Sequence, residues 1–100
     1  MTKSILHTVN QSPFNSDTLA QCIASYRPGD SILLLEDGVY AALLSHAFVD
    51  QLAGTICYGI EADINARGLH RQALMPSLQL TDYKGFVALS VQHPLIQSWY

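Results

Sequence analysis

The stretch Gly29–Leu43, G-D-S-I-L-L-L-E-D-G-V-Y-A-A-L, decides the fold of this chain. Ser31–Leu35 has the continuous apolar character of a strand that is buried on both faces of a sheet. An acidic turn, Glu36–Gly38, follows at once, and Asp37 is placed to cap a helix that continues to about Phe48. A buried strand, a tight turn and a helix that packs back over the strand make half of a βαβ unit, so the sequence predicts an α/β fold.

Strand and helix patterns alternate along the rest of the chain. Leu19, Ile23 and Tyr26 lie at i, i+4 and i+7, which predicts one apolar face of a helix over Asp17–Arg27. The other predicted elements are strands Ser4–Val9, Thr55–Ile60 and Leu78–Thr81, a short helix Glu61–Ala66 with Gly68 as its C-cap, a loop Leu69–Ser77, a helix Tyr83–Gln92 capped by Asp82 and closed by Pro94, and an aromatic tail Leu95–Tyr100. We therefore expect one domain over residues 1–100, a three-layer α/β/α sandwich around a mostly parallel sheet of four or five strands.

Composition and charge exclude several classes of protein. The 100 residues are 49% hydrophobic and 13% charged, and the formal net charge is −3. Because the five Lys and Arg residues form no basic run, we expect no direct binding to nucleic acid. The apolar runs are far shorter than the roughly 20 residues that span a bilayer, and no signal peptide is visible, so we expect a cytoplasmic protein without a membrane segment. The low charge content also predicts that part of the apolar surface faces another subunit.

Cys22 is the main candidate for chemistry. A persulfide carrier needs a thiol that forms a thiolate and reaches a partner's sulfur, and a cysteine early in a helix after a loop can meet both needs. A capping box at Thr18 would put Cys22 about one turn into the helix, where the helix N-terminus lowers a thiol pKa. A cap at Ser16 would put it nearer the second turn, where that effect has faded. The alternative is that Cys22 is a small apolar residue on the inner helix face, the role we also assign to Cys57 inside its strand.

The other polar candidates favour structural roles. The four histidines, His7, His46, His70 and His93, never stand at a metal-ligand spacing, and the cysteines form no C-x-x-C pair, so we predict neither a metal site nor a cofactor. His7 has the best claim to more, because it lies on the first strand near the loop that leads to Cys22. Glu36 and Asp37 follow a strand, where open α/β sheets place their ligands. Helix capping by Asp37 and solvation of Glu36 explain the pair equally well, with Gly38 allowing close backbone approach.

Four ordered segments, together covering both ends and the centre of the chain, resemble the TusB/DsrH family. They are I-L-H-T-V-N-Q-S-P-F (Ile5–Phe14), G-D-S-I-L-L-L-E-D-G-V-Y-A-A (Gly29–Ala42), A-R-G (Ala66–Gly68) and D-Y-K-G-F-V-A-L-S-V-Q-H-P-L-I-Q-S-W-Y (Asp82–Tyr100). The resemblance implies a small subunit of a cytoplasmic sulfur-relay complex. Its expected partners are TusC/DsrF-like and TusD/DsrE-like paralogues, with which it would form a heterohexamer of two heterotrimers. Sulfur would arrive from a TusA-like donor and leave as a cysteine persulfide for a TusE/DsrC-like acceptor.

The resemblance leaves two branches and two roles open. One branch is 2-thiolation of the wobble uridine in tRNA, and the other is intracellular sulfur oxidation. The resemblance implies that the main sulfur-carrying cysteine belongs to the TusD/DsrE-like subunit. Sulfur-oxidation versions of the DsrH subunit carry a cysteine at the position of Cys22, whereas many tRNA-thiolation versions lack it, so Cys22 favours the DsrH type. The expected function is a sulfurtransferase-complex subunit with Cys22 as a persulfide carrier, and the alternative is a non-catalytic assembly subunit.

Overall fold

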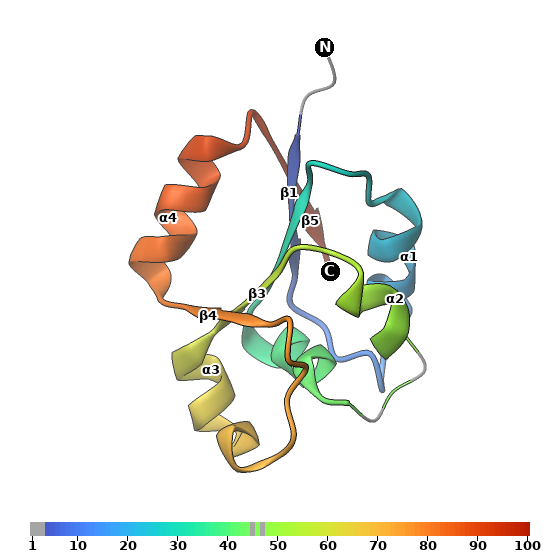
Figure 1. Cartoon of the computed structure of the whole chain (residues 1–100), viewed down its shortest axis with the longest axis vertical. Coiled ribbons are helices and arrows are strands. Elements are labelled where there is room, and N and C mark those ends of the chain that lie inside the picture. Colours follow the sequence, from blue (N-terminus) through green and yellow to red (C-terminus); the bar gives the residue numbers. More distant parts are fainter. Residues whose placement is uncertain (1–3, 45, 47) are drawn as a thin grey trace.

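The centre of the fold is a five-stranded sheet in which every neighbouring pair of strands runs parallel (Figure 1). The structure is a computed structural model and describes residues 4–44, 46 and 48–100. The strands stand in the order β4-β3-β2-β1-β5. Their bounds are β1 Ile5–Val9, β2 Ser31–Leu34, β3 Cys57–Ile60, β4 Gln79–Thr81 and β5 Leu95–Trp99. The predicted central strand is therefore the middle strand of the sheet.

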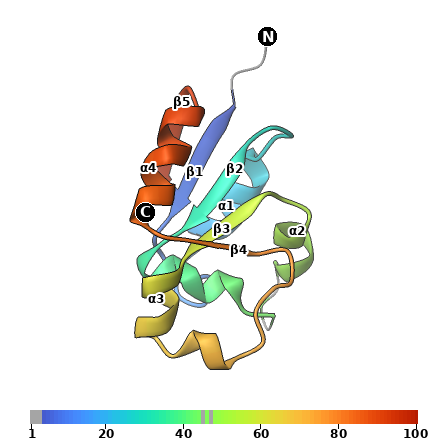
Figure 2. The same cartoon turned by 60° about the vertical axis from the view of Figure 1, so that its left-hand side comes forward.

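Helices cover both faces of this sheet, as the sequence predicted. They are α1 Thr18–Ser25, the 3₁₀ helix η1 Glu36–Ala42, α2 Val49–Ala53, α3 Glu61–Ala66, the 3₁₀ helix η2 Leu69–Arg71 and α4 Tyr83–Gln92. Figures 1 and 2 show α1 and α2 on one side of the strands and α4 on the other. A large core that includes Leu19, Ile32 and Leu52 fills the first side, and a smaller core around Leu33 and Leu89 fills the second. The three-layer α/β/α prediction is thus confirmed.

The predicted helix from Asp37 to Phe48 is wrong. The chain instead forms η1, which ends at Ala42, and a separate helix α2. Leu43 is extended because it forms an antiparallel bridge with Leu74, while the carbonyl of Ala42 accepts the N–H of Met75 at 2.8 Å. Contacts with a distant segment therefore override local helix propensity. Positions 45 and 47 of the predicted helix lie outside the described residues.

The C-terminal segment also differs from its prediction as an aromatic tail. Leu95–Trp99 is a strand, β5, which pairs with β1 along its whole length, from Ile5 with Leu95 to Val9 with Trp99. The pairing gives β1 a neighbour on each side and makes β5 one edge of the sheet. The predicted loop Leu69–Ser77 begins with η2.

Asp82 caps α4 as predicted, and this contact provides a first test of the structure. Its carboxylate accepts the backbone N–H of Gly85 at 2.8 Å. Asp82→Ala should lower the free energy of unfolding by about 1 kcal/mol, because an N–H of the first turn loses its acceptor. Urea titration followed by circular dichroism measures the change. Asp17→Ala is the matched control, since Asp17 holds the same position on α1 without a side-chain cap bond. An equal loss in both variants would contradict the capping role.

Candidate functional site

The position of Cys22 on α1 lies between the two that the sequence allowed. The N-cap residue is Asp17, so neither Thr18 nor Ser16 caps the helix, and the hydroxyl of Ser16 instead accepts the N–H of Thr18 at 3.2 Å. Cys22 thus lies just beyond the first turn. The electrostatic effect of a helix N-terminus fades within that turn. The start of α1 therefore does little to stabilise a thiolate on Cys22.

Burial decides the chemistry that the Cys22 thiol can perform in this conformation. The side chain is 0% exposed and belongs to the large core. Desolvation by burial, together with the negative charge of Asp30, raises the pKa of Cys22 to about 12. A thiol needs both its ionised form and access to a partner for sulfur exchange. The carrier role of Cys22 stays a prediction, and it requires α1 or its covering residues to move.

Cys57 occupies the core position that its strand predicted. Its side chain is 0% exposed, and burial followed by the proximity of Cys22 raises the pKa of its thiol. The two cysteines therefore lie in the same core as free thiols. They behave as small apolar residues there.

His7 is a fully hydrogen-bonded strand histidine. It is 1% exposed, and its Nε2 lies 2.9 Å from Oδ2 of Asp30 while its Nδ1 accepts the indole N–H of Trp99 at 3.0 Å. Asp30 also accepts the backbone N–H groups of Ile5 at 2.9 Å and Arg27 at 3.1 Å. Burial alone would raise the pKa of Asp30, but the hydrogen bonds from His7, Ile5 and Arg27 outweigh it and hold that pKa below its usual value. This network joins β1, β5 and the loop before β2.

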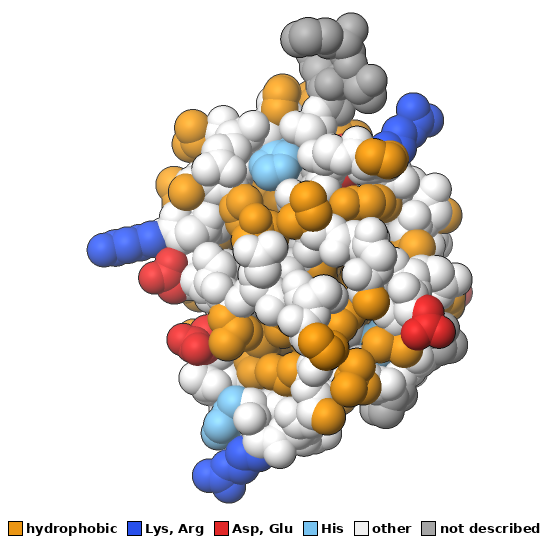
Figure 3. Space-filling view, viewed as in Figure 1, with side chains coloured by type: hydrophobic (Ala, Val, Ile, Leu, Met, Phe, Trp, Pro, Cys, Tyr) orange, Lys and Arg blue, Asp and Glu red, His pale blue; other side chains and the backbone are white. Residues whose placement is uncertain are grey.

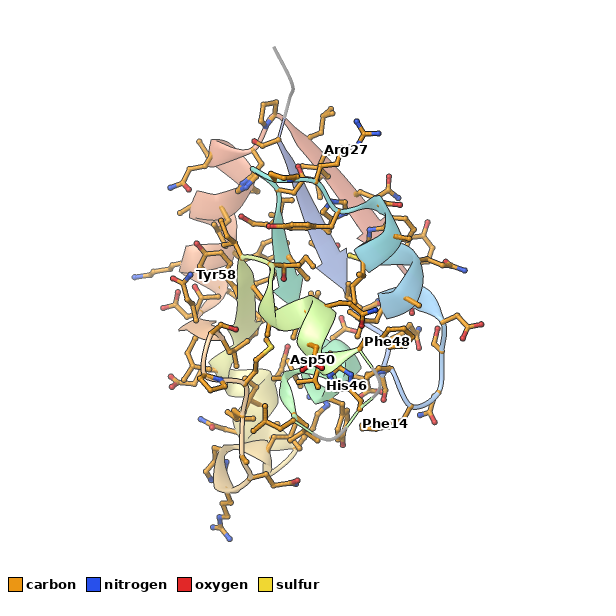
Figure 4. The ribbon with its side chains drawn as sticks, turned by 45° about the vertical axis from the view of Figure 1, so that its right-hand side comes forward. Phe14, Arg27, His46, Phe48, Asp50 and Tyr58 are labelled. Atoms are coloured by element: carbon orange, nitrogen blue, oxygen red, sulfur yellow. The ribbon has the colours of Figure 1, made fainter. Side chains whose placement is uncertain are left out.

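His46 also has structural partners. Its Nδ1 accepts the N–H of Phe48 at 3.2 Å, and its Nε2 lies 2.8 Å from the carbonyl of Ala41. The ring of Phe14 meets it edge-on, with the ring centroids 6.3 Å apart. Figure 4 shows Phe14, His46 and Phe48 close together in the lower right of the view, away from Arg27. The histidine therefore organises the segment between η1 and α2.

The acidic turn is tied into the chain by contacts that the sequence did not reveal. Asp37 pairs with Arg67 at 2.9 Å and does not cap a helix, which corrects the capping prediction. The backbone N–H of Glu36, a residue with φ of 51°, donates to Asp63 at 2.7 Å. The hydroxyl of Tyr83 donates to the same carboxylate at 3.3 Å. These contacts connect the start of η1 to α3 and α4.

A cavity of about 350 Å³ lies at this end of the sheet, and Glu61, Leu80, Thr81 and Asp82 line it. Glu36 and Asp37 are not among its lining residues. Among residues 4–44, 46 and 48–100, no group of three or more His, Cys, Asp or Glu side chains is arranged to hold a metal ion. Within the part of the chain that the structure describes, no helix is both long enough and apolar enough to cross a membrane.

Apolar side chains are exposed on α4 and on the sheet edges. Tyr83, Val87 and Val91 lie at i, i+4 and i+8 of α4 and are 51%, 62% and 81% exposed. Leu80 on β4 and Ile96 on β5 are each 51% exposed. Figure 3 shows apolar side chains across the face of the molecule, with the charged side chains at its margins. Exposed apolar area of this kind is typical of a surface that contacts another protein.

Comparisons with known proteins agree on one family. The model of the family described as DsrH like protein matches residues 11–95. The chain is 36% identical over 97 residues to protein TusB of Pectobacterium atrosepticum and 37% identical over 97 residues to protein TusB of Escherichia coli; in each case the match covers 95% of this chain and 100% of the relative.

Two solved structures support the fold. The ychN protein from E. coli has a TM-score of 0.83 at 14% identity, and the match covers 98% of this chain and 100% of that one. Protein Tm0979 from Thermotoga maritima has a TM-score of 0.62 at 25% identity, and the match covers 88% of this chain and 92% of that one. The family model and the curated relatives show that the chain belongs to the TusB/DsrH family.

Proposed function

We propose that this chain is an assembly subunit of a sulfur-relay complex, in the tRNA 2-thiouridine system to which the TusB/DsrH family belongs. In this proposal it joins TusC/DsrF-like and TusD/DsrE-like paralogues in a cytoplasmic heterohexamer. The complex receives sulfur from a TusA-like donor and passes it to a TusE/DsrC-like acceptor. The names of the curated relatives favour the tRNA branch, while Cys22 is the feature that favours intracellular sulfur oxidation.

The assembly role rests on one contrast: the thiol of Cys22 is buried, whereas apolar side chains on α4 are exposed. Cys22 is 0% exposed, whereas the apolar side chains of Val87 and Val91 on α4 are mostly exposed. Each sulfur transfer in such a relay converts one persulfide and one thiol into a thiol and a new persulfide, and the attacking group is a thiolate. A buried thiol with a pKa near 12 is a poor nucleophile at neutral pH. The sulfur-carrying thiol is therefore assigned to a TusD/DsrE-like partner.

Cys22→Ala tests this division of roles. The three subunits are purified together, supplied with a persulfidated TusA-like donor, and followed by mass spectrometry of every cysteine. We expect no transfer when this chain is left out, and full transfer when either the wild-type chain or Cys22→Ala is present, because the chain supplies shape and not a thiol. Cys57→Ala is the matched control, since it also removes one buried thiol from the same core.

Three outcomes would contradict the proposal. Transfer that proceeds without this chain would remove it from the relay. A persulfide found on Cys22, with transfer lost in Cys22→Ala but kept in Cys57→Ala, would establish the carrier role instead. Failure of the three chains to purify together would argue against the assembly itself.

A further inference from the structure

The hydrogen bonds of His7 define where its proton lies. An indole nitrogen can only donate, so the Nδ1 of His7 that faces Trp99 at 3.0 Å must be an unprotonated acceptor. The Nε2 must then carry the hydrogen, which it donates to the carboxylate of Asp30 at 2.9 Å. Both bonds form together only when the ring is neutral and in this tautomer. The network therefore selects one protonation state of a residue that is 1% exposed.

We infer that a proton on Nδ1 of His7 and the hydrogen bond from Trp99 exclude each other, so that His7 acts as an acid-sensitive latch on the C-terminal strand. Protonation takes one proton from water onto Nδ1, and the indole N–H of Trp99 then faces another donor. The bond from Nε2 to Asp30 is kept and becomes a bond between opposite charges. Acid therefore weakens the attachment of β5 while it strengthens the attachment of β1 to the loop before β2.

β5 is the element whose attachment should weaken when His7 is protonated. It is an edge strand, and β1 is its one neighbour in the sheet. Besides the backbone ladder, the side-chain bonds between the two strands are Trp99 to His7 and Thr8 to Ser98, the latter at 3.3 Å. The side chains of Leu95–Ser98 are exposed, so Trp99 is the most buried side chain of β5 and packs against the large core. Loss of the indole bond leaves β5 held by packing, one hydroxyl bond and the ladder.

The other ionisable groups near His7 are either buried or held in hydrogen bonds of their own. Asp30 lies before β2 and is held ionised by its three N–H donors. Cys22 on α1 is a buried neutral thiol. Tyr26, the residue after α1, has its ring centroid 6.1 Å from that of His7 and donates its hydroxyl to the carbonyl of Asp30. Arg27 contributes its backbone N–H to Asp30. Imidazole is the side chain that ordinarily changes charge between about pH 5 and 8.

Nuclear magnetic resonance of the free chain tests the latch. Trp99 is the single tryptophan of the sequence, so its indole N–H signal is unambiguous. We expect Nδ1 of His7 to be unprotonated at neutral pH. On acidification the His7 ring signals and the indole signal should move with a common midpoint, and the indole hydrogen should then exchange with water about fivefold faster, as expected for one lost hydrogen bond.

Trp99→Phe supplies the matched variant, because it keeps an aromatic ring in the core and removes the donor. The indole bond stabilises neutral His7, so its removal should raise the titration midpoint of His7 by about half to one pH unit. The midpoints of His46 and His93, which bond to other partners, should stay unchanged. An unchanged His7 midpoint in Trp99→Phe, an indole signal that ignores the titration of His7, or a His7 that stays neutral until the chain unfolds would each overturn the inference.

Discussion

Replacing Gly38 by alanine should destabilise the chain by about 3 kcal/mol or more, because the new methyl group has no space. A Cβ atom at Gly38 would overlap the carbonyl oxygen of Val9, and it would lie 2.7 Å from that carbonyl carbon and 3.2 Å from the nitrogen of Asn10. Neither β1 nor the turn at Gly38 can move away easily, because backbone hydrogen bonds hold both. The carbonyl of Val9 accepts the N–H of Leu35 at 3.1 Å, and the N–H of Gly38 itself donates to Leu35 at 2.9 Å.

Gly54→Ala is the control for this prediction. Gly54 follows α2 in a right-handed helical conformation, and a Cβ there would lie 3.4 Å from the carbonyl oxygen of Gln51, an ordinary van der Waals contact. We expect its stability to stay close to that of the wild type. Thermal unfolding followed by circular dichroism compares the three proteins. A Gly38→Ala chain as stable as Gly54→Ala would show that the start of η1 does not pack closely against the end of β1.

The elements with local signals could be predicted from the sequence. The predicted strand Ser31–Leu35 is β2, which ends one residue earlier, at Leu34. Glu61–Ala66 and Tyr83–Gln92 are helices with the predicted bounds, because a glycine follows the first and Asp82 caps the second. The C-cap of α3 is Arg67 and not the predicted Gly68, which comes next in the left-handed conformation. Gly38 was expected to allow a close backbone approach, and the end of β1 lies against it. These features depend on neighbouring residues and so leave a local pattern.

Features that depend on distant residues could not be predicted in this way. Val39–Leu44 has helix-forming residues, yet the bridge from Leu43 to Leu74 ends η1. β5 is a strand because β1 offers it a free edge, and that partner lies about 90 residues earlier in the chain. A strand-forming segment, Leu95–Trp99, was the available signal, but its place in the sheet depends on the path of the whole chain.

In the candidate site too, features with a local signal could be predicted and contacts between distant residues could not. The helical period placed Cys22 beside the apolar face of α1, which fits either a buried or a half-exposed thiol, and the fold makes it fully buried. The sequence predicts Asp30 as a turn residue after Gly29. Its carboxylate is nevertheless aimed at His7 on the adjacent strand. A charged residue next to a buried strand and a histidine within another strand were the signals for this pair, but the sequence does not bring them together.

Asp30→Ala should lower the free energy of unfolding by about 3 to 5 kcal/mol. Asp30 is 3% exposed, and its carboxylate accepts N–H groups from His7, Ile5 and Arg27. Alanine leaves these donors without an acceptor in a region that water does not reach. His7 cannot compensate by moving its hydrogen to Nδ1, because the indole of Trp99 already donates there.

The pH dependence gives a second measurement of the same contact. Because the folded state holds the pKa of Asp30 below its usual value, the stabilisation is fully present above the unfolded pKa and is lost as pH falls through the folded one. Urea titrations from neutral pH to below about pH 4 should therefore show a steeper acid loss for the wild type than for Asp30→Ala. Asp30→Asn should lie between the two at neutral pH, since one amide oxygen can still accept from His7 and Arg27 while the amide nitrogen meets the N–H of Ile5. Equal stability of Asp30→Asn and the wild type, with parallel acid slopes in all three proteins, would mean that the carboxylate charge does not hold the network together.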